Sequence, residues 1–181
     1  MSQELEILKT VTRRLAEANH PYRVTGSIAM NYYALPRMTR DIDIVVELTE
    51  SSVDQTVDLF LQDFYVDRDM AREAVDRKSM FNIIHIAFVI KVDFIVRKDS
   101  EYRRIEFSRR HPVEIDGQAV SIVAPEDLIL SKLEWAKESH PEMQLNDVRN
   151  IIKGVHSLDR VYLIKWVTQL GLSAIYEKAI Q

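Results

Sequence analysis

Two carboxylates lie one residue apart inside a segment that otherwise has the composition of a buried strand. In DIDIVVEL (residues 41–48), apolar residues occupy positions 42, 44, 46 and 48. Because side chains alternate between the two faces of a strand, Asp41 and Asp43 share one face and these apolar residues share the other. The segment therefore predicts a strand with one face in the core and acidic side chains on the other.

A later segment, KVDFIV (residues 91–96), repeats this pattern around Asp93. If both strands belong to one sheet and turn their apolar sides to the same core, Asp93 lies on the same exposed face as Asp41 and Asp43. Like charges about 4 Å apart repel by roughly 4 kcal/mol per pair at an effective dielectric constant of about 20. That repulsion is a large part of the marginal stability of a domain, so the three carboxylates require a compensating cation.

The compensating cation has two candidate sources. Oxygen ligands without His or Cys suit a hard ion, and Mg²⁺ commonly takes one or two carboxylates and completes its shell with waters and substrate phosphates. Alternatively, Asp41 and Asp43 form surface ion pairs with Arg37, Arg40 or Lys91, each worth about 0 to 1 kcal/mol. An Asp-x-Asp pattern alone favours the ion pairs.

The dipeptide Gly26-Ser27 favours the metal. It stands between a predicted strand at 22–25 and a short predicted helix at 28–35, which Pro36 ends. Glycine permits close backbone approach, and the free N–H groups of a helix N-terminus bind anions such as phosphate. An anion site beside a carboxylate cluster meets the needs of a metal-bound nucleoside triphosphate.

These motifs resemble a known signature. VTGS (24–27), then thirteen residues, then DIDI (41–44) is similar to the signature of the nucleotidyltransferase superfamily, in which Asp93 corresponds to the third carboxylate. The stretches LPRMTRD (35–41) and APEDLILSKLE (124–134) resemble the AbiEii-type branch, which includes toxins of bacterial toxin–antitoxin systems. The resemblance covers about residues 20 to 150. It departs from many relatives at Ala34, where they have glycine, and this affects a turn rather than the chemistry.

The resemblance implies a Mg²⁺-dependent transfer of a nucleotide from an NTP to an acceptor hydroxyl, with release of pyrophosphate. It assigns Asp41, Asp43 and Asp93 to Mg²⁺ binding and catalysis, with Asp93 helping to activate the attacking hydroxyl. Gly26 and Ser27 would hold the phosphates.

Three basic residues are further candidates for nucleotide binding. Lys132 lies within the apolar stripe formed by positions 129, 133 and 136 of one predicted helix, so its charge requires a partner. Resembling proteins carry a lysine in this helix, which favours phosphate binding over a side chain that snorkels at the edge of the stripe. Arg37 and Arg40 flank the acids, and either steady the triphosphate or neutralise the cluster.

The order of predicted elements indicates the fold class. A chain of 181 residues is long enough for a sizeable core. Strands and helices mix up to residue 123, with a hairpin turn at Asp116-Gly117, and helices alone follow. We therefore expect an α/β (α+β) architecture, with a nucleotidyltransferase-type mixed β-sheet core and flanking helices over 1–123 and a helical region over 124–181 packed on it.

The composition of the chain limits the cellular compartment and the kinds of partner that we expect. The absence of cysteine excludes disulfides and thiolate chemistry. No segment has the length and apolarity of a signal peptide core or a membrane span, so we expect a soluble, cytoplasmic protein without a membrane partner. The net charge of −4 gives no general reason to bind nucleic acid. The run 97–110, with six basic and three acidic residues, is interpreted as a solvated face rather than a basic patch.

Three functions fit this pattern, two of them enzymatic and one non-catalytic. The first is a toxin-like nucleotidyltransferase that uses Mg²⁺ and an NTP to modify RNA or protein, with a cognate antitoxin protein as partner. The second is transfer of a nucleotide to a small molecule such as an antibiotic. The third is a non-catalytic protein that binds nucleotide or acts as an antitoxin-like partner, and the presence of all three carboxylates weighs against it.

Overall fold

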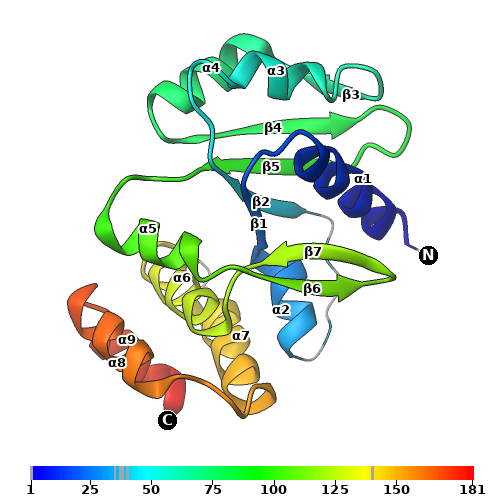
Figure 1. Cartoon of the computed structure of the whole chain (residues 1–181). Helices are drawn as coiled ribbons and strands as arrows, with labels where there is room; N and C mark the ends of the chain where they lie inside the picture. The colour runs from blue at the N-terminus through cyan, green and yellow to red at the C-terminus, as the bar shows by residue number, and fades with distance from the viewer. Residues whose placement is uncertain (1, 35, 37–38, 40, 140) are drawn as a thin grey trace. The chain divides into compact units, whose positions relative to one another are not determined.

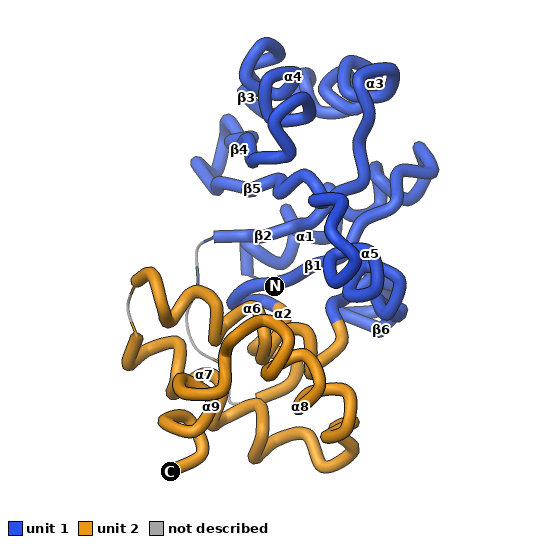
Figure 2. Tube along the Cα trace, turned by 90° about the vertical axis from the view of Figure 1, so that its left-hand side faces the viewer, with its two compact units in different colours: residues 1–28, 38–123 blue, residues 29–37, 124–181 orange. Residues whose placement is uncertain are grey.

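The computed structural model describes residues 2–34, 36, 39, 41–139 and 141–181. The chain divides into two compact units (Figure 2). The first, called here the sheet unit, contains residues 1–28 and 38–123, and the second, the helical unit, contains residues 29–37 and 124–181. These units differ from the predicted domain boundaries in the placement of residues 29–37.

The sheet unit is built on a mixed sheet whose described strands run in the order β3-β4-β5-β2-β1-β7-β6 (Figure 1). The pairs β2–β5 and β1–β7 are parallel, and the other neighbours are antiparallel. The predicted mixed α/β class is therefore confirmed. The strands are β1 (Tyr22–Thr25), β2 (Ile42–Val46), β3 (Phe64–Val66), β4 (Met80–His85), β5 (Lys91–Val96), β6 (His111–Ile115) and β7 (Gln118–Ile122).

One face of this sheet carries the hydrophobic core. The alternating apolar residues of β2, among them Ile42 and Ile44, are fully buried in one cluster with Leu8 and Val11 of α1 (Gln3–Glu17). Helices α3 (Val53–Asp58) and α4 (Arg68–Asp76) contribute to the same cluster. Each such aliphatic side chain stabilises the fold by about 1.5 to 3 kcal/mol on burial, so this face fixes the strand register.

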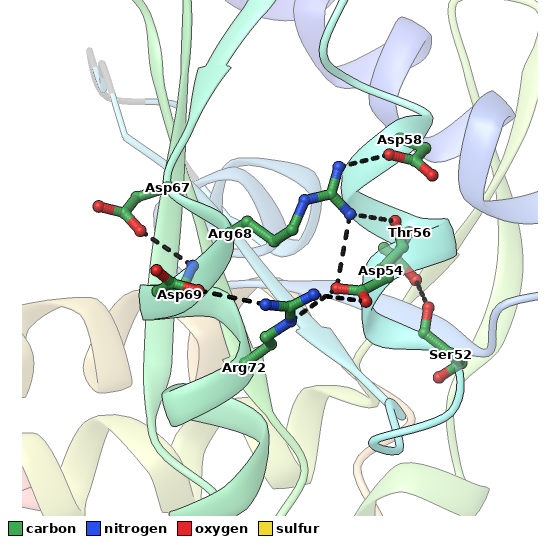
Figure 3. A network of polar contacts seen from close by, with 8 residues as sticks. All are labelled: Ser52, Asp54, Thr56, Asp58, Asp67, Arg68, Asp69 and Arg72. Atoms are coloured by element: carbon green, nitrogen blue, oxygen red, sulfur yellow. Dashed lines mark hydrogen bonds and ion pairs between the residues drawn. The ribbon is translucent and has the colours of Figure 1, made fainter.

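A network of ion pairs joins α3 to α4 (Figure 3). Arg72 donates to both carboxylate oxygens of Asp54 at 2.9 and 2.8 Å, and Arg68 donates to Asp58 at 2.5 Å. The hydrogen bond from Arg72 lowers the pKa of Asp54. Asp67 begins α4 by accepting two backbone N–H groups of its first turn. The network orients two helices whose inner faces are in the core.

Two elements of the sheet unit were not predicted. Helix α3 ends at Asp58, and the short strand β3 follows at Phe64–Val66. The run interpreted as a solvated face contains α5 (Glu101–Ser108), which Ser100 caps by accepting the N–H of Arg103. Strand β3 is too short to show an alternating pattern. In α5 the many basic residues make the segment look solvent-exposed in the sequence, although the side chains at 102, 106 and 107 are buried.

The helical unit contains α6 (Pro125–Glu138), α7 (Pro141–Gly154), α8 (Arg160–Gln169) and α9 (Ser173–Ile180), together with the end of α2 (Gly26–Tyr33). A Cβ at Gly154 would lie 2.5 Å from the carbonyl oxygen of Tyr33. This close backbone approach explains why residues 29–37 group with the C-terminal helices. In the part of the chain that the structure describes, no helix combines the length and apolarity needed to cross a bilayer.

Helix α1 is fixed to the loop before β3 by a two-pronged ion pair. Arg14 donates to Asp63 at 2.6 and 2.7 Å and to the carbonyl oxygen of Leu59 at 3.1 Å. Its guanidinium also lies 5.8 Å from the ring centres of Phe60 and Phe64. The hydrogen bond from Arg14 lowers the pKa of Asp63.

We predict that Asp63→Asn lowers the free energy of unfolding at pH 7 by about 1 kcal/mol, because the paired charge is lost. The folded-state pKa of Asp63 lies below its unfolded value, so this stabilisation is complete above about pH 4 and is lost as the pH falls further. Urea unfolding at pH 7 and at pH 3 measures the difference, which should shrink at the lower pH. Asp76→Asn, on the exposed side of α4, is the control and should change stability little at either pH.

Candidate functional site

The parallel pairing of β2 with β5 places two carboxylates side by side. Asp43 is the Cα partner of Asp93, and on the other side of β2 it is the partner of Thr25. Side chains directly opposite each other on neighbouring strands share a face, with Cβ atoms about 5 Å apart. Asp41 immediately precedes β2. The structure thus brings together the predicted acidic residues on the face that alternation indicated.

Burial differs among these acids, and it corrects one expectation. The face was predicted to be exposed, but Asp93 is only 5% exposed. The Asp41 side chain, in contrast, is 62% exposed. The Oδ1 atom of Asp93 is buried without a hydrogen-bond partner among the described residues. A buried carboxylate oxygen without a partner is costly, so this atom has unused capacity to accept a bond.

Lys91 is the described cation of this cluster. Its ammonium lies 2.8 Å from Asp93 Oδ2 and 3.7 Å from Asp41 Oδ1. The hydrogen bond to Asp93 raises the pKa of Lys91, and the charges of Asp93, Asp41 and Asp43 add to this effect. Ion pairing by Lys91, one of the alternatives considered for the acids, is therefore present. Arg37 and Arg40, the other two candidates, lie outside the described residues.

Gly26 allows the backbone to approach the acids. Its φ is +61°, and a Cβ built on it would lie 2.0 Å from Asp43 Oδ2. Only glycine fits this turn, because a side chain at this position would be strained by the positive φ and would clash with the Asp43 carboxylate. Ser27 follows as the second residue of α2. The predicted Gly-Ser turn and the second acid are thus in contact through Gly26.

Lys132 is buried in the helical unit, in α6. Its ammonium donates to Asp147 Oδ2 at 2.6 Å and to Gln144 Oε1 at 3.3 Å, both on α7. Lys132 and Asp147 are only 5% and 3% exposed. Sequence reasoning anticipated that a lysine in an apolar stripe needs a partner, but did not identify Asp147. The predicted contact of Lys132 with phosphate stays a prediction.

The carboxylates on the sheet offer Mg²⁺ a small set of oxygen donors. In the described part of the chain, no group of three His, Asp or Glu side chains is placed to hold a metal ion as it stands. Two carboxylates, Asp43 and Asp93, lie opposite each other, and one buried oxygen of Asp93 has no hydrogen-bond partner among the residues that the structure describes. Because Mg²⁺ commonly takes one or two carboxylates and completes its shell with phosphates and water, this pair fits such an ion.

Comparisons with known proteins support the fold. No family model and no curated protein matches the chain. An antigenic nucleotidyltransferase-like protein from Paracoccidioides brasiliensis has a similar structure, with a TM-score of 0.60 and 17% identity over 97% of this chain and 93% of that one. The fold is nucleotidyltransferase-like. The predicted fold is therefore confirmed, whereas the AbiEii-type resemblance stays a prediction.

Two antibiotic-modifying enzymes share this nucleotidyltransferase-like fold. ANT(2'')-Ia, in complex with adenylyl-2''-tobramycin, has a TM-score of 0.61 and 13% identity over 98% of this chain and 99% of that one. Lincomycin-bound LnuA, a lincosamide antibiotic adenylyltransferase, has a TM-score of 0.54 and 10% identity over 83% of this chain and 96% of that one. At these identities the likeness concerns the fold.

We predict that Gly26→Ala lowers the free energy of unfolding by about 2 kcal/mol, from the positive φ and from the clash with Asp43. Gly171→Ala is a matched control, because Gly171 has a φ of +64° and nothing within 4 Å of a built Cβ. The control should lose only the conformational part, about 1 kcal/mol. Urea unfolding of both variants measures the difference, and equal losses would show that the contact with Asp43 carries no cost.

We predict that Asp147→Leu costs about 3 kcal/mol of stability, because it leaves the Lys132 ammonium buried without its acid. The double variant Lys132→Met/Asp147→Leu should recover much of this loss, since it removes both charges. Chemical unfolding of the wild type, of Asp147→Leu, of Lys132→Met and of the double variant completes a double-mutant cycle. Additive losses would contradict the coupling of the two side chains.

Proposed function

We propose that this protein is a Mg²⁺-dependent nucleotidyltransferase, which transfers a nucleotide from an NTP to an acceptor hydroxyl. The observation that carries the proposal is the register of β2 and β5, which pairs Asp43 with Asp93 beside the Gly26 turn. The nucleotidyltransferase-like fold supports it, because solved structures with this fold include two adenylyltransferases. The family resemblance of the Gly-Ser and Asp-x-Asp motifs points to the same reaction.

The metal and phosphate sites follow from the same residues. Asp43 and Asp93, with Asp41 at the exposed edge, would hold Mg²⁺, which supplies positive charge to the phosphates when bound. Ser27, the second residue of α2, would contact a phosphate oxygen by its hydroxyl and its backbone N–H, as the resemblance implies. Gly26 keeps this turn against Asp43. Lys132 is proposed as a further phosphate contact from its place in the apolar stripe and from the resemblance. Arg37 and Arg40 are proposed because they flank the acids in the sequence, where they either steady the triphosphate or neutralise the cluster.

The transfer step is an in-line displacement at the α-phosphorus. The acceptor hydroxyl oxygen forms a bond to this phosphorus, and the bond from the phosphorus to the oxygen that bridges the α- and β-phosphates breaks. Pyrophosphate leaves with the electron pair of that bond. The hydroxyl proton would pass to the Asp93 carboxylate, to which the family resemblance assigns help in activating the attacking hydroxyl.

The acceptor defines two versions of the proposal. The resemblance of residues 35–41 and 124–134 to AbiEii-type sequences favours RNA or protein as the acceptor, with a cognate antitoxin protein as partner. The fold shared with ANT(2'')-Ia and LnuA favours a small-molecule hydroxyl as the second candidate. One fold hosts many acceptors, so the acceptor has to be found by experiment.

We predict Mg²⁺-dependent transfer of label from one of the four α-labelled nucleoside triphosphates to bulk RNA, to protein or to an aminoglycoside. Asp43→Asn and Asp93→Asn should each lower the rate at least about a hundredfold, as expected when charge stabilisation of the transition state is lost. Gel autoradiography and thin-layer chromatography of the products identify donor and acceptor together. Asp76→Asn is the control and should retain the wild-type rate.

Two results would count against the proposal. Label that moves equally well in chelator, or equally well in Asp43→Asn, would show that these carboxylates do not serve the reaction. No transfer to any acceptor, together with no thermal stabilisation by Mg²⁺ and any triphosphate, would favour a non-catalytic, antitoxin-like binding partner.

A further inference from the structure

We propose that Lys91 is a built-in cation of the carboxylate site, which a divalent metal ion has to displace before it binds. The inference rests on the proposed function, because it concerns the same carboxylates. In this proposal Lys91 has a role that the reaction itself does not require. Its ammonium neutralises the carboxylates of the nucleotide-free protein, and it thereby sets the metal concentration at which the carboxylates bind the ion.

The first observation is the position of Lys91. It precedes Asp93 by two residues on β5, so both side chains project from the same face of the sheet. Its ammonium contacts the Oδ2 atom of Asp93 at 2.8 Å and lies 3.7 Å from Oδ1 of Asp41. One ammonium is therefore shared by two of the three carboxylates that are proposed to bind metal. A metal ion on these oxygens would compete with it directly.

The second observation is the difference in exposure between the partners. The Lys91 side chain is 42% exposed, whereas that of Asp93 is 8% exposed. The ammonium can turn into water without disturbing the core, because a long lysine side chain keeps its apolar part on the protein surface. The Asp93 carboxylate has no such freedom. The acid is fixed and its cation is exchangeable.

The third observation is the incomplete pairing of Asp93. Lys91 occupies Oδ2, while Oδ1 is buried without a partner among the described residues. Most buried polar side-chain atoms in folded proteins have a hydrogen-bond partner, so the unpartnered oxygen requires an explanation. The half-filled Asp93 fits a site that exchanges its monovalent occupant for a metal ion able to use the second oxygen.

The test compares nucleotide-free wild type with Lys91→Met in thermal unfolding, first in chelator and then over a series of MnCl₂ concentrations. In chelator the variant should melt lower, because Asp93 loses its cation. The half-saturating Mn²⁺ concentration should fall by about five- to tenfold in the variant, as expected when a competing half-exposed ion pair is removed. Lys91→Arg keeps the charge and should follow the wild type.

Lys9→Met is the matched control. Lys9 forms an ion pair of 2.9 Å with Asp116 in the β6–β7 hairpin turn, so this variant also loses one lysine and one ion pair. It should lose stability in chelator but keep the Mn²⁺ dependence of the wild type. Asp43→Asn should weaken the Mn²⁺ response in both the wild-type and the Lys91→Met background.

The outcomes separate this inference from the proposed function. If Mn²⁺ stabilises the wild type through Asp43 and Lys91→Met shows the same or a higher half-saturating concentration, the inference is overturned and the proposed function stands. If Mn²⁺ stabilises none of these proteins, with or without a nucleoside triphosphate, the proposed function fails and the inference with it.

A measurement on the unaltered protein covers the case in which Lys91→Met does not fold. Acetic anhydride should modify Lys91 faster in Mn²⁺ than in chelator, because metal binding releases the ammonium, while the rate at Lys9 stays constant. Mass spectrometry of the peptides reports both rates. Unchanged relative reactivity of Lys91 at saturating Mn²⁺ would overturn the inference.

Discussion

Repulsion between Asp43 and Asp93 is the constraint around which the sheet unit is arranged. Their positions are fixed by the parallel pairing of β2 and β5, and that pairing is held by the apolar residues on the opposite face. A slip of one residue would turn these acids into the core, so the fold cannot relieve the repulsion by moving a strand. It is relieved locally instead, by the ammonium of Lys91.

The same face of the sheet contains a second set of buried charges. Arg23 of β1 and Glu106 of α5 are 3% and 1% exposed and lie 2.6 Å apart, and Arg103 binds the other oxygen of Glu106 at 2.9 Å. Arg23 is two residues from Thr25, the partner of Asp43, and therefore projects from the face of the acids. The sheet thus separates an apolar face, which provides stability, from a polar face, where each charge depends on a specific partner.

Local patterns in the sequence were sufficient to predict the strands and turns that form the site. Alternation placed Asp43 and Asp93 on one face, and the Asp116-Gly117 hairpin follows from residues that tolerate the positive φ of +48° and +76° seen there. Features set by contacts between distant segments were missed. Asp147 is the partner of Lys132 only because α6 packs against α7. The burial of Asp93 depends on tertiary packing, which the residue pattern of its own strand does not indicate. The strand β3 was missed because three residues show no period.

The chain path between the two compact units limits how the protein can be divided. The backbone passes from the sheet unit to the helical unit after Ile28, returns at Met38 and leaves again after Val123. A fragment that starts at Ala124 would therefore lack residues 29–37, including the Tyr33 carbonyl that Gly154 approaches. The complementary fragment, residues 1–123, would contain residues 29–37 without the C-terminal helices with which they group. No single cut of the chain therefore yields the two units as separate fragments, because each unit contains residues from both sides of residues 29–37 or of Val123.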